Sequence, residues 1–246
     1  MTEHPSWQYD EFRQIGRDYG DPAHVEDYDS RHSAYRDIDA ECQSTLDSLD
    51  LPSDAILIDI GTGTGAFALH ASRSCARVYA VDVSGPMLDF AARKAAETGV
   101  ANITFCHAGF LTYEHQGEPA DAIVTSLAFH HLPDFWKGIA LGRMNGMLKQ
   151  GGKLFIRDVV FEQTDIAGNI SRWIEHLASN GAPHIGEGIV VHVREEHSTF
   201  DWIIEGLLER AGFRILSRQL DGGVMAQYLC TKETEIAGQS RADGTA

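Results

Sequence analysis

The chain has 246 residues, of which 43% are hydrophobic, and its 36 acidic and 20 basic residues give a formal charge of −16. This length fits one α/β domain with additions, and the hydrophobic fraction excludes global disorder. Phosphate backbones attract clusters of Lys and Arg, so the acidic balance argues against a nucleic-acid partner. No apolar run reaches the ~20 residues of a membrane span, and the N-terminus lacks the apolar core of a signal peptide. A cytoplasmic location and no membrane partner are therefore predicted.

The first half of the chain alternates between predicted helices and strands. Residues 1–52 are polar and rich in aromatic side chains, and they predict an N-terminal helical lid. An apolar run then ends in glycines, which is typical of a strand buried on both faces of a parallel sheet. The predicted elements are a helix at Ser33–Leu49, a strand at Ala55–Ile60, a helix at Gly65–Ser74, a strand at Arg77–Asp82 and a helix at Pro86–Thr98.

The second half continues this alternation but is interrupted by residues 162–198, which are too long for a simple connection and predict an inserted substrate cap. Asp221-Gly222-Gly223 predicts a hairpin, and the small polar residues 233–246 predict a disordered tail. Alternating strands and helices imply a parallel sheet with helices on both faces. Strands are predicted at Ile103–Cys106, Ala122–Ser126, Lys153–Val160, Phe213–Leu220 and Val224–Lys232, and helices at Asp134–Lys149 and Thr199–Ala211.

The connection after the first strand reads Gly61-Thr62-Gly63-Thr64-Gly65. Glycines lack Cβ atoms and the start of a helix presents free N–H groups, so the backbone here can approach a ligand closely. The same glycines, with Ala66 and Asp82, also satisfy the dinucleotide-binding fingerprint. Three features argue against a dinucleotide cofactor and favour another one. They are Asp59 at the end of the apolar strand, the long stretch before that strand, and the final hairpin.

Four segments resemble, in order, the motifs of class I S-adenosylmethionine-dependent methyltransferases. They are Ile56–Leu69, Val78–Ser84, Ala122–Leu132 and Met147–Phe155. More narrowly, Gly109–Leu111, Ala128–Leu132 and the final hairpin are similar to those of small bacterial members that are usually taken to act on small molecules. The resemblance implies an α/β, Rossmann-like, doubly wound sheet of seven strands in the order 3-2-1-4-5-7-6. The last strand is antiparallel, and residues 53–232 form the methyltransferase domain.

The resemblance also implies a role for each residue of a cofactor site. Family members often carry an Asp at the position of Phe110 to receive the adenine amino group, which the Phe110 side chain cannot do. The implied cofactor-binding residues are Gly61, Thr62, Gly63 and Gly65 beside the methionine part, Asp59 at its ammonium, Asp82 at both ribose hydroxyls, Val83 and Met87 against adenine, Gly109, Phe110 and Leu111 at the adenine edge, Ser126 and Leu127 facing the reactive methyl, and Tyr28 closing over the cofactor.

Two adjacent histidines follow the fourth predicted strand. His130 is the candidate catalytic base because histidine titrates near neutrality, and a capping or packing role is the alternative. His131 is the more structural of the two, because the family pattern keeps a His there across many chemistries. The histidines of the insertion match no familiar ligand spacing, so no metal is predicted, and surface positions are expected for His192 and His197.

The predicted function is methyl transfer from S-adenosylmethionine to a small-molecule N, O or S nucleophile, which leaves S-adenosylhomocysteine. Arg157 and Asp158 end the fifth predicted strand, where ligands bind in open α/β sheets, so either is a candidate substrate contact. A monomer or homodimer is expected. Two alternatives stay open: a nicotinamide-dependent oxidoreductase that uses the same glycine loop and a separate proton donor, and a non-catalytic module that binds S-adenosylmethionine.

Overall fold

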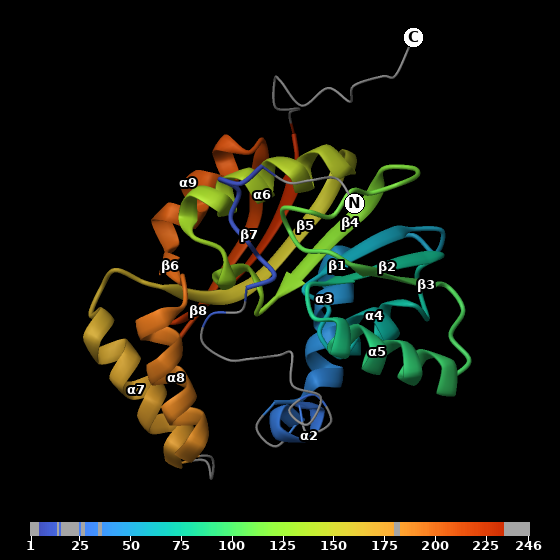
Figure 1. The fold of residues 1–246 in the computed structure, drawn as a ribbon. Coiled ribbons are helices and arrows are strands. Elements are labelled where there is room, and N and C mark those ends of the chain that lie inside the picture. Colours follow the sequence, from blue (N-terminus) through green and yellow to red (C-terminus); the bar gives the residue numbers. More distant parts are fainter. Residues whose placement is uncertain are drawn as a thin grey trace.

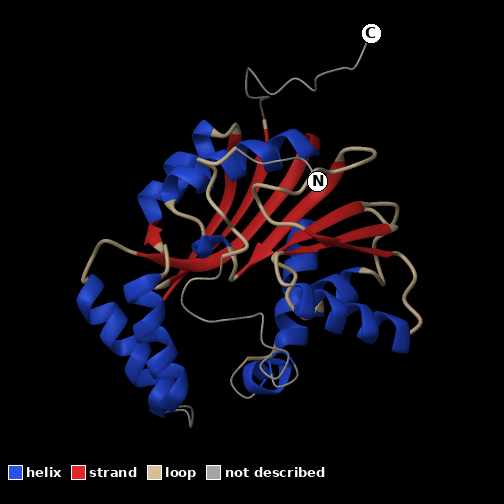
Figure 2. Cartoon of the chain, in the orientation of Figure 1, coloured by secondary structure: helices blue, strands red, loops and turns tan. Residues whose placement is uncertain are grey.

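The computed structural model describes residues 5–13, 15, 25, 28–33, 36–179 and 183–233. A twisted central sheet carries helices on both faces, which confirms the predicted Rossmann-like α/β fold (Figure 1, Figure 2). Part of the predicted lid at 1–52 and nearly all of the predicted tail at 233–246 lie outside the described residues. None of the described helices has both the length and the apolar character needed to cross a bilayer.

The strand order is β3-β2-β1-β4-β5-β8-β7, as predicted. Neighbours from β3 to β5 are parallel, whereas β8 runs antiparallel to both β5 and β7. A further strand, β6, was not predicted; it has two residues and pairs with the end of β5. The strands are β1 (Ile56–Ile60), β2 (Arg77–Asp82), β3 (Ile103–His107), β4 (Ala120–Ser126), β5 (Leu148–Phe161), β6 (Thr199–Phe200), β7 (Phe213–Asp221) and β8 (Met225–Lys232).

Two hydrophobic clusters, one on each face of the sheet, form most of the core. Side chains from α6 and α9 pack into one cluster, and side chains from α3 and α4 pack into the other. Figure 1 shows α5 on the same side as α4. The helices are α2 (Tyr28–Ser33), α3 (Ile38–Leu49), α4 (Ala66–Ala71), α5 (Gly85–Glu97), the short η1 (Phe129–His131), α6 (Asp134–Met147), α7 (Ile166–Ser179), α8 (Pro183–Glu195) and α9 (Asp201–Arg210).

The alternation of side chains along β1 explains why both faces of the sheet are covered. Ile56, Ile58 and Ile60 belong to the cluster under α6 and α9, whereas Leu57 belongs to the cluster under α3 and α4. Successive strand residues point to opposite faces, so Asp59 lies on the same face as Leu57. A carboxylate buried in such a strand is costly unless a partner compensates it. Asp59 is therefore a candidate for a ligand contact.

All five predicted helices differ from the observed ones at one or both ends, and three of these differences have a clear structural cause. The helix predicted over Ser33–Leu49 is observed as α3, which begins at Ile38. Asp37 caps its start by accepting a hydrogen bond from the backbone N–H of Ala40. The helix predicted over Thr199–Ala211 starts two residues later, because β6 occupies its first residues. The helix predicted over Asp134–Lys149 ends two residues earlier, because Leu148 already pairs with β4.

The predicted insertion at residues 162–198 is mostly a helical hairpin. Helices α7 and α8 lie side by side beyond the end of β5, away from the other helices (Figure 1). A small third hydrophobic cluster joins this hairpin to the sheet, and it includes Phe161 of β5, Trp173 of α7 and Val193 of α8. The hairpin therefore has its own packed contact with the core.

The glycine loop joins β1 to α4, and Gly61 and Gly63 have φ angles of +79° and +55°. Gly61 N donates a hydrogen bond to Val81 O at 2.8 Å, which ties the loop to β2. A Cβ atom on Gly61 would lie 2.3 Å from the Cβ of Ala128, whereas one on Gly63 would meet nothing within 4 Å. The loop is thus closely packed at Gly61 and open beside Gly63.

Gly61→Ala is expected to lower the free energy of unfolding by roughly 2–6 kcal/mol, because a positive φ and overpacking each cost about 1–3 kcal/mol. Gly63→Ala is the matched control, since it carries the backbone strain without the clash. Chemical denaturation of both variants measures the difference. Equal losses in the two variants would contradict this account of the loop.

Candidate active site

A cleft opens at the carboxyl ends of β1, β2, β4 and β5, the edge where ligands bind in open α/β sheets. All of the predicted cofactor residues except Gly65 and Leu111 line this cleft. Those lining it are Tyr28, Asp59, Gly61, Thr62, Gly63, Asp82, Val83, Met87, Gly109, Phe110, Ser126 and Leu127. The fold therefore brings together residues from several separate segments of the sequence.

Asp59 is 3% exposed and lines the cleft at the end of β1. Its Oδ2 accepts a hydrogen bond from Thr62 Oγ1 at 2.7 Å. Burial raises the pKa of the Asp59 carboxyl to about 7, and the negative charge of Asp82 adds to this shift although the Thr62 hydrogen bond opposes it. A nearby cation favours the ionised form of such an acid. Asp59 is thus suited to hold a positively charged group.

Asp82 ends β2 on the other side of the glycine loop. Its two carboxylate oxygens accept hydrogen bonds from Gly63 N at 2.7 Å and from Ser84 N at 2.8 Å. Burial raises the pKa of Asp82, and these backbone hydrogen bonds counteract part of that shift. These two hydrogen bonds fix the orientation of the Asp82 carboxylate. Because a carboxylate oxygen can accept two hydrogen bonds, Asp82 still has acceptor capacity for a ligand.

Phe110 packs into the core with its ring edge-on to Phe129, at a centroid distance of 5.1 Å. A carboxylate nevertheless reaches this edge of the cleft, from Glu11, which sequence reasoning missed. Glu11 accepts hydrogen bonds from Leu111 N at 3.0 Å and from Thr112 Oγ1 at 2.7 Å. Burial raises the pKa of Glu11, although these hydrogen bonds lower it. No local pattern marks Glu11, because its partners lie about a hundred positions along the chain.

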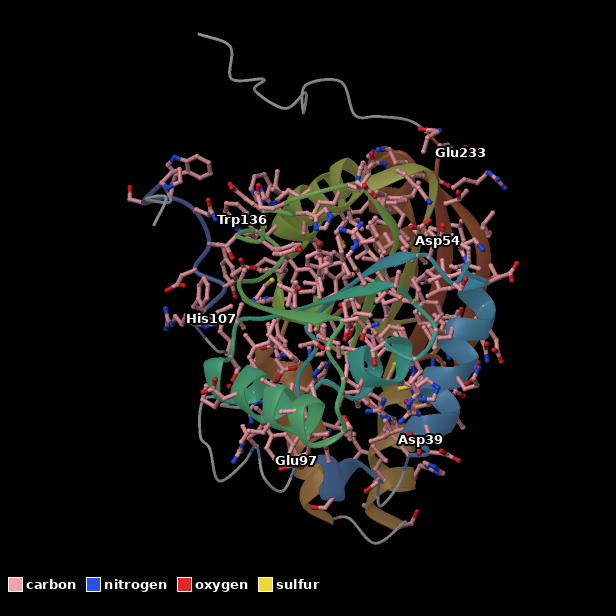
Figure 3. All side chains as sticks on the ribbon, turned by 90° about the vertical axis from the view of Figure 1, so that its right-hand side faces the viewer. Asp39, Asp54, Glu97, His107, Trp136 and Glu233 are labelled. Atoms are coloured by element: carbon pink, nitrogen blue, oxygen red, sulfur yellow. The ribbon has the colours of Figure 1, made fainter. Side chains whose placement is uncertain are left out.

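The described N-terminal segment, residues 5–13, runs along the cleft. In Figure 3 it passes from near Trp136 to near His107. Trp7 stacks on Trp136 with ring centroids 6.3 Å apart, and Tyr9 lines the cleft. This part of the segment is therefore in position to cover a ligand bound against the sheet.

The end of β4 has an unusual backbone. Leu127 has a φ of +54°, which non-glycine residues rarely adopt, and its N–H donates to Arg157 O at 2.8 Å. Such strain is common at functional sites. Arg157, a predicted substrate contact, also lines the cleft, and its Nη1 lies 2.7 Å from Glu41 Oε2. This ion pair holds α3 against β5 at the cleft.

The two adjacent histidines of η1 have different surroundings. His131 lines the cleft, whereas His130, the predicted candidate base, does not. His130 Nδ1 lies 2.5 Å from Asp158 Oδ1, and its Nε2 lies 3.2 Å from Glu196 Oε2. Burial alone would lower the pKa of His130, but the two carboxylates together raise it to about 9. Burial and the charge of His130 lower the pKa of His131 to about 4, so His131 is neutral at physiological pH.

The expected surface position of His192 is wrong. Its side chain is 12% exposed and its Nδ1 forms a close contact with Glu196. His197, also expected at the surface, is half-buried, and its backbone N–H donates to His130 O at 2.9 Å. Both side chains lose exposure because the end of α8 packs against η1. The spacing of the histidines within the insertion does not indicate this contact.

Comparison with known proteins gives consistent results. A family described as a methyltransferase domain matches residues 57–152. The chain is 28% identical over 195 residues to an uncharacterized methyltransferase of Geobacillus sp. (strain WCH70), which covers 79% of this chain and 85% of the relative.

Solved structures share the fold. A SAM-dependent methyltransferase from Aquifex aeolicus superimposes with a TM-score of 0.61 at 21% identity, over 86% of this chain and 98% of that one. An S-adenosylmethionine-dependent methyltransferase from Clostridium acetobutylicum ATCC 824 gives a TM-score of 0.63 at 14% identity, over the same shares of the two chains. The domain match and the related sequences are both those of methyltransferases, and the solved structures share the Rossmann-like fold of this chain.

Proposed function

We propose that the protein transfers a methyl group from S-adenosylmethionine to the N, O or S nucleophile of a small molecule. The observation that carries this proposal is a pair of acids, the buried Asp59 and the partly buried Asp82, on either side of a glycine loop in one cleft. S-adenosylmethionine offers an ammonium group at one end and a ribose diol in its middle. The two acids match these two groups.

The other parts of the cleft fit the remaining parts of the cofactor. Asp59 would bind the ammonium, and Asp82 would accept hydrogen bonds from the ribose hydroxyls, which a carboxylate does strongly. The open space beside Gly63 admits the ligand next to the backbone. Val83 and Met87 line the cleft after β2 and would pack against adenine.

Glu11 would supply the carboxylate that many family members have at the position of Phe110. Its carboxylate lies at the edge formed by Gly109 and Leu111, where the resemblance implies the adenine amino group. A Cβ on Gly109 would come within 2.4 Å of Glu11 Oε2, so the glycine leaves room for this carboxylate. Glu11 would therefore receive the adenine amino group from the N-terminal segment.

The bound cofactor supplies a methyl group on a positively charged sulfur. Ser126 and Leu127 would position the acceptor in line with that methyl, and alignment of this kind accounts for much of the rate of such displacements. Residues 5–13 would cover the cleft and exclude water. Where the acceptor arrives protonated, His131 would take its proton, because it is neutral and lines the cleft.

The nicotinamide-dependent oxidoreductase is less well supported, because it requires a proton donor at the cleft. Tyr228 and Lys232 have the Tyr-x-x-x-Lys spacing of such donors. However, Tyr228 is fully buried in β8, Lys232 Nζ donates to Leu148 O, and neither residue lines the cleft. A non-catalytic module would bind the same cofactor without turnover.

S-adenosylhomocysteine is expected to bind in calorimetric titration, and NAD⁺ is not. Asp82→Asn should weaken binding about 10–100-fold, since hydrogen bonds to a charged group contribute roughly 1.5–3 kcal/mol and 1.4 kcal/mol is tenfold. Asp89→Asn removes the same charge from an exposed site on α5 and should have little effect. A clear NAD⁺ isotherm with no response to S-adenosylhomocysteine would refute the proposed cofactor.

Cofactor affinity is expected to fall as the pH drops below about 7. The raised pKa of Asp59 leaves its carboxyl largely neutral below that pH, and a cationic ligand favours the ionised form. Binding should therefore release a proton near neutrality and weaken toward about tenfold per pH unit in more acidic solution. Titrations of S-adenosylhomocysteine between pH 5 and 8 test this, and Asp59→Asn should bind more weakly with a flatter profile.

Formation of S-adenosylhomocysteine is expected with at least one member of a panel of small thiols, amines and phenols. For an acceptor that needs a base, His131→Gln should lower kcat about 10²–10⁴-fold while cofactor affinity stays near that of the parent chain. His70→Gln is the control, because His70 lies on α4 and does not line the cleft. Cofactor binding with no turnover across the panel would favour the non-catalytic module.

A further inference from the structure

A second group of titratable side chains lies behind the cleft wall, and the proposed methyl transfer does not use it. His130 comes from η1 and Asp158 from β5, whereas His192 comes from the last turn of α8 and Glu196 directly follows that helix. Their side chains are 7%, 4%, 12% and 6% exposed, respectively. Four ionisable groups are thus gathered in a nearly dry site where the α7–α8 hairpin meets the sheet.

Three of these side chains point ligand atoms at one another. His130 Nε2 lies 3.2 Å from Glu196 Oε2, and His192 Nδ1 contacts the same oxygen. The ligand atoms of the three residues all lie within 4.8 Å of one another. Ligands about 2.0–2.2 Å from a tetrahedral zinc ion are roughly 3.4 Å apart, close to the first of these separations. The contact between His192 and Glu196 is shorter and would open when an ion enters.

The remaining nitrogen of each imidazole already has a partner. His130 Nδ1 lies 2.5 Å from Asp158 Oδ1, and His192 Nε2 lies 2.7 Å from Ser198 Oγ. In metal sites the nitrogen that does not bind the ion usually donates to a carboxylate or another acceptor, which fixes the ring and its tautomer. Both imidazoles of this cluster are held in that way.

The charges of the cluster also favour a bound cation. Two deeply buried carboxylates, Asp158 and Glu196, require compensating positive charge. One divalent cation would balance the charge of both carboxylates, and histidine binds metals as the neutral imidazole. Two histidines and one carboxylate, with a further position for water, are a ligand set typical of zinc.

We propose that His130, His192 and Glu196 bind one Zn²⁺ ion, with Asp158 and Ser198 positioning the two imidazoles. His192 and Glu196 are four residues apart, and Glu196 N donates to His192 O at 3.0 Å, so both side chains lie on one side of the end of α8 and a single ion would join that end to η1. The ion would thereby fasten the α7–α8 hairpin to the sheet. The site does not overlap the cleft, so this proposal is independent of the proposed methyl transfer.

The test uses the full chain, stripped of metal with a chelator and titrated with Zn²⁺ by calorimetry and with Co²⁺ by visible absorption. We expect one Zn²⁺ per chain, a higher melting temperature with Zn²⁺, and Co²⁺ bands typical of a low-symmetry site with nitrogen ligands. Glu196→Gln and His192→Asn should abolish stoichiometric binding. Asp158→Asn should weaken it about 10–100-fold, the usual cost of losing such a partner.

The matched control is His176→Asn, which removes an exposed histidine from the same hairpin and should leave Zn²⁺ binding unchanged. A chain that binds neither Zn²⁺ nor Co²⁺ would overturn the proposal and leave a hydrogen-bonded cluster of two histidines and two carboxylates. Stoichiometric binding that survives in both Glu196→Gln and His192→Asn would overturn it as well. The measurements on the parent chain decide the matter even where a variant fails to fold.

Discussion

Two backbone hydrogen bonds, from Gly61 N and Thr62 N to Val81 O, join the glycine loop to the end of β2. The same loop touches the segment after β4, because Gly61 has no Cβ to hold Ala128 away. Three strand ends are thereby drawn around one short turn. The positions of Asp82 and of the residues after β4 relative to the loop follow from this packing. The shape of the cleft therefore requires a glycine at position 61.

The buried acids of the molecule differ in what compensates them. Asp59 accepts a hydrogen bond from a neutral hydroxyl, and burial raises its pKa to about 7. Asp158 accepts hydrogen bonds from the His130 ring and from the backbone N–H groups of Phe129 and His130. Burial would raise the pKa of Asp158, but the charge and hydrogen bond of His130 lower it. Asp59 is thus ready for an incoming cation, whereas Asp158 already serves the structure around it.

Segments outside the central sheet bring carboxylates to its loops in two places. Glu11 brings a carboxylate from the N-terminal segment to Leu111, and Glu196 brings one from the end of the inserted hairpin to His130. In both cases a glutamate from an added segment meets a loop that follows a strand of the parallel part of the sheet, β3 for Glu11 and β4 for Glu196. The additions to the Rossmann-like sheet therefore do more than enclose it, because they contribute charged groups at its functional edge.

The sequence by itself determined the central sheet, the glycine loop and the two acids beside it. A strand buried on both faces must be apolar, and the turn after it must accept positive φ, so Ala55–Ile60 and the glycines that follow carry these features in a local pattern. Only the tertiary structure decided that His131 rather than His130 lines the cleft, and that Glu11 and His192 contact residues far away in the sequence. Neighbouring residues in a tight helical turn point about 120° apart, and contacts between remote segments depend on how the chain folds back on itself. Neither property leaves a periodic signal in the sequence.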